Sequence, residues 1–461
     1  MVRVLIIGGG ISGLALAHRI GQYLAGAKVT ILEKENRPGG TIATVSEGGF
    51  LFEKGPNGFL DNNPATLNLS RELGLEAELI HATTYAAKNR FLFLNGKLQL
   101  LPGSLLGFLG TGILSWKAKL SLLMERFCPP LLEDRDETVA EFAKRRVGQE
   151  VADRLVGPFV SGIFAGDPDR LSMKASFPRI TAMEKEHGSV FKGFAVQRHD
   201  HSRNGKTGPK LWSYRAGMEQ LIASLVERTG KENVRKFHAS SLKFDSATQC
   251  WKVSSSNGEE VEGDICVLAC PAHAQAELLK PLDLELGTLV GTIPYTRLAV
   301  VVMAFRSGDV PISLKGFGFL VPSIERRRIL GAQWCSSIYP GRAPAGMVLL
   351  RAMIGGVQQA ELLNLDDQTL ANLVYQELRE TMSVQSPAVF TKVIRWEKAI
   401  PQYLIGHCSL VEKIEEKAAS HAGLFLTGNA YKGIALNSCI ENAEPLAVRI
   451  SRWWSRERLP Q

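Results

Sequence analysis

The sequence predicts an α/β protein with a parallel sheet, and three observations lead to this prediction. A short apolar strand at residues 4–7 runs into a Gly-x-Gly-x-x-Gly turn at residues 8–13 and then into a helix at residues 14–20. A second strand at residues 28–32 ends in an acid, Glu33. Strand-and-turn pieces of the same kind recur in the middle of the chain and near its C-terminus. We therefore expect one Rossmann-type domain that is assembled from discontinuous segments.

Each glycine of the first turn has a physical task. Gly8 allows the tight turn, Gly10 lets a pyrophosphate approach the backbone, and Gly13 lets the helix lie close to the strand. The N-terminus of that helix presents free N–H groups to an anion. Glu33 stands at the spacing that suits the hydroxyls of an adenosine ribose. The segment predicts a dinucleotide site, and the alternative is a glycine-rich turn without a ligand.

The composition and charge exclude some classes of function. The chain has 461 residues, of which 45% are hydrophobic and 22% are charged, as in an ordinary soluble protein of two or three domains. The net charge of +8 is modest and fits an anionic substrate or membrane surface, and the lack of dense Lys/Arg runs argues against nucleic acid. The seven cysteines form no C-x-x-C pair, so we expect reduced thiols, a cytoplasmic location and no metal site. The first strand begins at residue 2, so we expect no signal peptide.

The rest of the chain supplies further elements. Residues 89–98 read as a hairpin around Asn95-Gly96, a strong turn pair. The section from about residue 100 to 197 is mostly helical, with a turn at residues 161–168, and the polar stretch 199–208 reads as a loop. We expect other strands at residues 233–237, 251–254, 264–271, 298–305, 347–354 and 423–429.

These elements predict three parts. They are a dinucleotide-binding domain of residues 1–88, 211–272 and 420–461, a mixed-sheet substrate domain of residues 89–98 and 273–419, and a mostly helical lobe of residues 99–210.

The lobe begins with the longest uncharged run of the chain, between Lys97 and Lys117. Pro102 and several glycines within it argue against a spanning helix, which leaves an apolar loop or an element seated on a membrane surface. Its apolar residues 98–114 and the nearby basic residues predict reversible association with anionic bilayers, and burial inside the lobe is the alternative.

Several motifs resemble known proteins. The first glycine turn with Glu33, the turn at residues 37–40 and the C-terminal Gly428-Asn429 with Gly433 resemble the flavin-dependent amine-oxidase superfamily. Within it, five further segments resemble the oxygen-dependent protoporphyrinogen oxidase family over nearly the whole chain: residues 53–58, 89–91, 161–178, 316–322 and 400–407.

The resemblance implies FAD as the cofactor and a set of residues around it. It places the pyrophosphate at Gly8, Gly9, Gly10, Ile11, Ser12 and Gly13, the adenosine at Glu33, Lys34 and the backbone of Val234, and the flavin side at Thr41, Gly55, Pro56, Asn57 and Gly58. Arg37 and Gly40 are further cofactor-binding residues that it implies. Ile434, Ala435 and Leu436 would open the last helix under the flavin ring. The positive end of that helix dipole would stabilise the negative charge of a reduced flavin.

The resemblance also implies a substrate and a reaction. The substrate would be a porphyrinogen, protoporphyrinogen IX with coproporphyrinogen III as the alternative, oxidised to the porphyrin by molecular oxygen in haem biosynthesis. Arg90 matches an arginine that faces a propionate, and Leu320 and Met353 match positions that flank the macrocycle. Gln333 stands where plant-type relatives have leucine, and Met353 where they have phenylalanine. No Ser/His/Asp set or carboxylate pair stands out, so we name no catalytic base.

Other functions stay open at this point. One is a different flavin amine oxidase or desaturase, and another is a non-catalytic member of the same fold, comparable to a Rab GDP-dissociation inhibitor. The sequence leaves open the physiological electron acceptor, the strength of any peripheral membrane contact, and the oligomeric state, a homodimer included.

Overall fold

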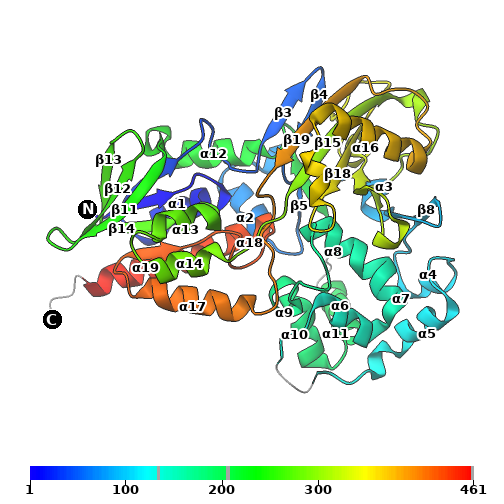
Figure 1. The fold of residues 1–461 in the computed structure, drawn as a ribbon, viewed down its shortest axis with the longest axis horizontal. Coiled ribbons are helices and arrows are strands. Elements are labelled where there is room, and N and C mark those ends of the chain that lie inside the picture. The colour runs from blue at the N-terminus through cyan, green and yellow to red at the C-terminus, as the bar shows by residue number, and fades with distance from the viewer. Residues whose placement is uncertain (132–134, 204–207, 458–461) are drawn as a thin grey trace.

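The computed structural model describes residues 1–131, 135–203 and 208–457. It consists of a parallel sheet with its helices, a mixed sheet, and a helical lobe below the mixed sheet in the view of Figure 1. The chain passes back and forth among these parts. The residues predicted at the cofactor, and those predicted at the substrate, therefore come from segments that are distant in the sequence. The exact bounds of the three predicted domains stay a prediction.

The parallel sheet has five strands in the order β10-β2-β1-β14-β20. All of its pairings are parallel. The strands are β1 (Arg3–Ile7), β2 (Lys28–Glu33), β10 (Val234–Lys236), β14 (Ile265–Leu268) and β20 (Leu424–Leu426). The N-terminal, middle and C-terminal pieces predicted from the sequence therefore meet in one sheet. Their carboxyl ends lie along one edge, where open α/β sheets bind their ligands.

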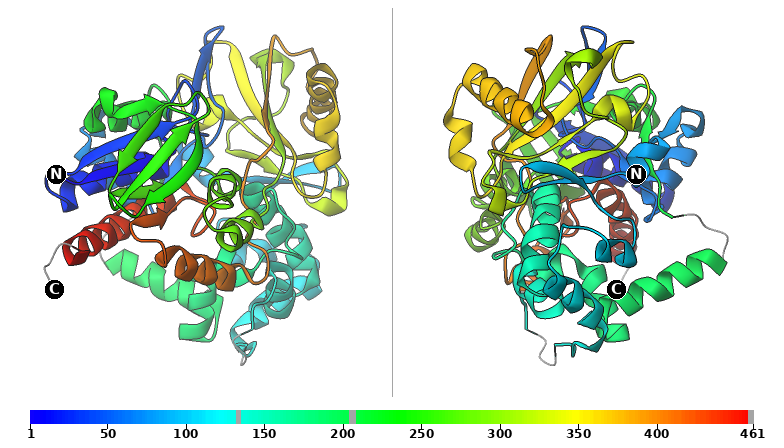
Figure 2. Two further views of the ribbon diagram at one scale, coloured as in Figure 1. Left: turned by 60° about the vertical axis from the view of Figure 1, so that its left-hand side comes forward. Right: turned by 90° about the vertical axis from the view of Figure 1, so that its right-hand side faces the viewer.

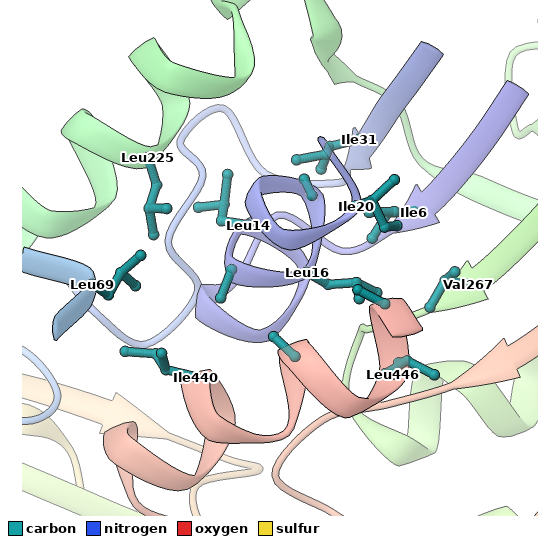
Figure 3. Packing of buried hydrophobic residues seen from close by; sticks show 14 of the residues in the cluster. Ile6, Leu14, Leu16, Ile20, Ile31, Leu69, Leu225, Val267, Ile440 and Leu446 are labelled. Carbon is teal, nitrogen blue, oxygen red and sulfur yellow. The ribbon is translucent and has the colours of Figure 1, made fainter. Parts of the chain in front are cut away.

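Helix α1 (Ile11–Tyr23) lies at the centre of the core beside this sheet. Figure 3 shows Leu14 and Leu16 of α1 among side chains from β1, β14 and α12 and from the C-terminal helices. A Cβ atom on Gly13 would overlap the Gly8 carbonyl oxygen, so only glycine lets the helix approach the turn this closely. The helix is longer than the predicted 14–20, because it begins at Ile11 and ends at Tyr23.

The mixed sheet has seven strands in the order β19-β15-β18-β17-β16-β7-β8. All neighbours are antiparallel except β16 and β7. The strands are β7 (Phe91–Leu94), β8 (Lys97–Leu100), β15 (Leu298–Arg306), β16 (Gly318–Leu320), β17 (Ile329–Gln333), β18 (Met347–Gly355) and β19 (Phe390–Trp396). The predicted hairpin is confirmed as β7–β8, with positive φ at both Asn95 and Gly96.

The two faces of the mixed sheet have different covers. Helix α16 (Asp367–Met382) covers one face, as Figures 1 and 2 show, and buries the larger apolar cluster. The other face packs against the hairpin β3–β4 (Thr44–Glu47 and Phe50–Glu53) at one end and against the helical lobe at the other. This second face carries the residues predicted to contact the substrate.

The remaining elements complete the three parts. They are β5 (Phe59–Leu60), β6 (Leu79–His81), β9 (Leu211–Tyr214), β11 (Ala239–Asp245), β12 (Cys250–Ser255), β13 (Glu260–Gly263), α2 (Ala65–Glu72), α3 (Thr84–Lys88), α4 (Leu105–Leu109), α5 (Trp116–Met124), α6 (Val139–Val147), α7 (Gln149–Val151), α8 (Gly157–Phe164), α9 (Met173–Ser176), α10 (Pro178–His187), α11 (Val190–Arg203), α12 (Glu219–Thr229), α13 (Ala272–Leu279), α14 (Leu284–Gly291), α15 (Cys335–Ile338), α17 (His407–Ala419), α18 (Leu436–Glu441) and α19 (Ala443–Glu457).

Three expectations about local structure were wrong in part. The predicted turn at 161–168 is helical up to Phe164 and turns only at Ala165, whose φ of 47° is left-handed. The predicted loop 199–208 is helical from 199 to 203, since α11 continues to Arg203, and residues 204–207 lie outside the described residues. The helix that begins at Leu436 is not the last one, because α19 follows it.

The predicted apolar run of the lobe divides between the interior and the surface. Ile113 and Leu114 are buried in a cluster that also holds Leu122 of α5. Leu100 and Leu109 are exposed. In the part of the chain that the structure describes, no helix is both long and apolar enough to cross a bilayer.

Candidate functional site

The first glycine turn forms an open cradle at the end of β1. Gly8 has φ +113°, and a Cβ atom there would lie 2.7 Å from the backbone nitrogen of Cys270. A Cβ atom on Gly10 would meet nothing within 4 Å, although Gly10 precedes the first turn of α1. Ser12 is buried in that first turn, and Ile11 is half-buried. The turn is therefore closed on its protein side and open where the pyrophosphate was predicted.

The residues predicted at the adenosine lie together at the carboxyl end of β2. Glu33 Oε2 accepts a hydrogen bond of 2.7 Å from the Gly9 N–H, and its Oε1 accepts one of 2.8 Å from the Glu35 N–H. Val234 pairs with Ile31 in the neighbouring strand, two residues before Glu33. Lys34 is exposed. The carboxylate thus joins the second strand to the glycine turn.

A second glycine loop closes over the first. The Gly39 N–H donates to the Gly9 carbonyl at 2.7 Å, and a Cβ atom on Gly40 would lie 3.6 Å from the Cα of Gly10. The guanidinium of Arg37 donates to the carbonyl oxygens of Pro38, Gly40 and Ile42. The structure therefore places Arg37 as a brace of this loop, with its donors directed to these carbonyls and to the Glu219 carboxylate at 3.3 Å, while Thr41 is exposed.

The loop of residues 55–58 packs against this pair of loops. A Cβ atom on Gly55 would overlap the Thr41 carbonyl oxygen, and one on Gly58 would overlap the Tyr339 hydroxyl. Pro56 is half-buried between them. The amide nitrogen of Asn57 is buried, and no acceptor among the described residues lies within hydrogen-bond distance. An acceptor oxygen of a bound ligand would satisfy this donor, so the loop fits the flavin predicted beside it.

The C-terminal segment adds a short helix to the same region. Ala435 is the exposed N-cap of α18, and Ile434 before it is half-buried. Leu436 is buried, and the side chain of Asn437 next to it donates to the Leu60 carbonyl at 2.7 Å. The start of α18 is thus fixed to the N-terminal part of the chain while Ala435 faces outward.

The predicted substrate residues share one face of the mixed sheet. Leu320 pairs with Gly331 and Gly331 pairs with Met353, so Leu320 and Met353 stand on the same side, and alternation along β17 puts Gln333 on that side as well. All three side chains are partly exposed. A Cβ atom on Gly162 of α8 would lie 2.9 Å from Leu320. The structure therefore brings these three together, with α8 opposite.

Arg90 lies at the end of this face, just before β7. Alternation along β7 places it on the side of Leu92, the residue that pairs with Leu320. Its guanidinium lies 5.4 Å from the ring centre of Phe317, and no carboxylate of the described chain is within ion-pair distance. The side chain is solvent-accessible, yet desolvation by its surroundings lowers its pKa. An accessible cation without a protein partner is suited to hold an anionic ligand.

Sequence reasoning missed Arg351, which connects the two halves of the site. Its Nη2 donates to the Gly55 carbonyl at 2.6 Å, and its Nη1 donates to Gln333 Oε1 at 3.3 Å. The side chain is only 6% exposed, and its Nε has no hydrogen-bond partner among the described residues. A lone charge in an otherwise apolar strand was the signal that could have found it.

A buried acid lies near this connection. Glu53 accepts hydrogen bonds from the Met218 N–H at 2.9 Å and the Thr44 hydroxyl at 2.8 Å. Arg342 approaches it only to 4.0 Å. Burial raises the pKa of Glu53 and lowers the pKa of Arg342 and of Arg351. The region behind the 55–58 loop thus holds two desolvated cations and one desolvated acid.

Comparison with known proteins finds similar proteins that match nearly the whole chain. The family described as flavin containing amine oxidoreductase matches residues 11–451. The coproporphyrinogen III oxidase of Bacillus subtilis is 30% identical over 96% of this chain and 96% of its own length. The chloroplastic protoporphyrinogen oxidase 1 of Arabidopsis thaliana is 32% identical over 98% of this chain and 88% of its own length. A crystal structure from Exiguobacterium, provisionally named a protoporphyrinogen oxidase, superposes with a TM-score of 0.84 at 26% identity and covers 98% of this chain and 99% of that one.

The open space above Gly10 gives a direct prediction. We expect Gly10→Val to leave the fold intact, because its extended backbone suits a branched residue and nothing lies within 4 Å of the added Cβ. The same side chain would occupy the space of the pyrophosphate, so the purified protein should lack flavin absorbance near 450 nm. A yellow Gly10→Val protein would contradict the assignment, and circular dichroism checks that the apoprotein is folded.

Proposed function

The chain belongs to the flavin containing amine oxidoreductase family, and we propose that it is an FAD-dependent oxidase that converts a porphyrinogen to a porphyrin in haem biosynthesis. Family membership confirms the flavin enzyme predicted from the sequence. The dinucleotide form, FAD, agrees with the glycine cradle and with Glu33 at the end of β2. Molecular oxygen as electron acceptor is part of the proposal.

One observation carries the proposal. Arg351 is hydrogen-bonded to Gly55, in the loop predicted at the flavin, and to Gln333, on the face predicted at the substrate. The two half-sites were predicted from separate motifs, and one side chain spans them. A flat substrate on this sheet face would therefore lie next to the loop predicted at the flavin, which supports direct hydrogen transfer between them.

The site residues supply binding and orientation. When bound, FAD supplies two-electron oxidation, and the full conversion takes three such steps: one porphyrinogen and three oxygen molecules give one porphyrin and three hydrogen peroxide molecules. Leu320 and Met353 offer apolar contacts to a macrocycle, and Arg90 offers a cation to a propionate. Formation of the aromatic ring provides the driving force, so the protein needs no strongly activated base.

Two porphyrinogens are candidates, and the relatives carry names of both kinds. Protoporphyrinogen IX is the first expectation from the sequence, and coproporphyrinogen III is the alternative. The polar Gln333 and the buried cation of Arg351 beside it favour the substrate with more carboxylates. The proposal is tested by mixing flavin-loaded protein with each porphyrinogen under air and measuring porphyrin fluorescence. No increase in fluorescence with either porphyrinogen would contradict it.

We further propose that the helical lobe contacts a membrane surface. One stripe of α5 and the turn after it is apolar and exposed: Trp116, Leu120, Leu123, Met124 and Phe127, between 41% and 70% exposed. Lys117, Lys119 and Arg126 flank this stripe. Exposed apolar side chains beside basic ones suit peripheral binding to anionic lipid. With the free thiols of all seven cysteines, this supports a location on the cytoplasmic face of the membrane.

Arg90 provides a test of substrate binding. Loss of one charge-assisted hydrogen bond costs roughly 1.5–3 kcal/mol in a desolvated site. Because the Arg90 side chain is solvent-accessible, we expect the low end of that range, about a tenfold rise in KM for Arg90→Ala. Arg90→Lys should recover part of the loss, since a point charge cannot reproduce the planar fork.

Steady-state kinetics on flavin-loaded variants measures these effects. Arg228→Ala, an exposed arginine on α12, is the matched control and should behave as the unmodified enzyme. Unchanged kinetic constants in Arg90→Ala would show that Arg90 is only a surface charge.

Vesicle flotation tests the membrane contact. The unmodified protein should float with phosphatidylserine-containing vesicles at low salt and less with pure phosphatidylcholine, because the flanking cations need anionic lipid. Trp116→Ser combined with Leu120→Ser should abolish flotation. Leu284→Ser, at a site that is 70% exposed on α14, is the control and should float normally. Equal flotation of both variants would exclude the α5 stripe.

A further inference from the structure

Arg351 is a buried cation, and no acid among the described residues forms an ion pair with it. It lies on β18 opposite Gln333 of β17, to which it donates at 3.3 Å. Its guanidinium also donates to the Gly55 carbonyl at 2.6 Å, and burial lowers its pKa. An unpaired buried charge opposes folding, so stability does not account for this side chain.

The chemistry of Arg351 fixes the orientation of the Gln333 amide. A guanidinium has donors only, so Gln333 must present its carbonyl oxygen to it. The two N–H donors of the amide then point away from Arg351. No hydrogen bond from the Gln333 amide nitrogen occurs within the described residues, and the side chain is partly exposed. Gln333 therefore offers free donors on the face that holds Leu320 and Met353.

We propose that Arg351 is a positioning residue that holds the N–H donors of Gln333 toward the substrate, and that this pair selects porphyrinogens with a carboxylate at this edge of the macrocycle. The inference rests on the proposed function. A carboxylate accepts such hydrogen bonds and a vinyl group does not. Coproporphyrinogen III carries propionates at the two positions where protoporphyrinogen IX carries vinyl groups. The enzyme should therefore have the higher kcat/KM with coproporphyrinogen III.

The ratio of kcat/KM for the two porphyrinogens tests the pair, since a general structural defect lowers both values alike. Gln333→Leu should reduce the ratio of coproporphyrinogen III to protoporphyrinogen IX by about tenfold or more. Arg351→Met should reduce it similarly, because the amide is then free to turn. The double variant should show no further loss, because Arg351 acts through Gln333.

A second variant at Gln333 distinguishes the loss of the donors from a packing defect caused by leucine. Gln333→Glu keeps the size of the side chain and gains an ion pair with Arg351, while its donors become acceptors, so it should also lower the ratio. Gln376→Leu, an exposed glutamine of α16 on the opposite side of the sheet, should leave both substrates unaffected. Flavin content is measured for each variant before kinetics.

Each outcome separates this inference from the proposed function. If the unmodified enzyme oxidises neither porphyrinogen, the proposed function fails. If it oxidises them but Gln333→Leu and Arg351→Met leave the ratio unchanged, or if the two losses simply add, the pair does not determine specificity. A changed flavin reduction potential in Arg351→Met with an unchanged ratio would assign Arg351 to the cofactor and overturn the inference.

Discussion

Backbone-to-backbone packing of three glycine loops is the constraint on which the candidate site depends. Gly13 lies against Gly8, Gly39 is hydrogen-bonded to Gly9, and Gly55 lies against Thr41. A side chain at Gly13 would overlap the Gly8 carbonyl oxygen of its own turn, and one at Gly55 would overlap the Thr41 carbonyl oxygen of the neighbouring loop. The space above Gly10 is left open by this arrangement. The loops come from different parts of the first sixty residues, so their contact sets where β1, β2 and the mixed sheet stand relative to one another.

Buried charged side chains connect these three glycine loops to the mixed sheet. Glu53 caps the region by accepting from Met218 and Thr44, and Arg351 reaches from β18 to the Gly55 carbonyl. Such groups cost free energy when they are buried, and hydrogen bonds to backbone carbonyls offset part of that cost. Their contribution is geometric, because a planar guanidinium forms good hydrogen bonds only when the acceptor atoms lie in particular directions. The cofactor loop and the substrate face are thereby held in a fixed relation.

The sequence predicted those features that depend on local pattern. The strand, turn and helix at residues 4–20 were predicted because glycine spacing and apolar periodicity are local, and the hairpin at Asn95-Gly96 was predicted for the same reason. The turn at residues 161–168 was misplaced because the left-handed residue is Ala165, which has no turn preference of its own. Leu320, Gln333 and Met353 were named from resemblance, and their common face follows from strand register. The position of Arg351 as a lone charge in an apolar strand could have marked it as a site residue, but its role could not be predicted, because its partners Gly55 and Gln333 are distant in the sequence.

The central claim is that a porphyrinogen on this sheet face gives its hydrogen to a flavin held by the glycine loops. Anaerobic rapid mixing of the flavin-loaded protein with a porphyrinogen tests it most directly, with flavin absorbance near 450 nm and porphyrin fluorescence followed together. The account predicts that the flavin absorbance is lost as the porphyrinogen is consumed, and that admitted air restores it with release of peroxide. Flavin that stays oxidised with both porphyrinogens but bleaches with a primary amine would contradict the account.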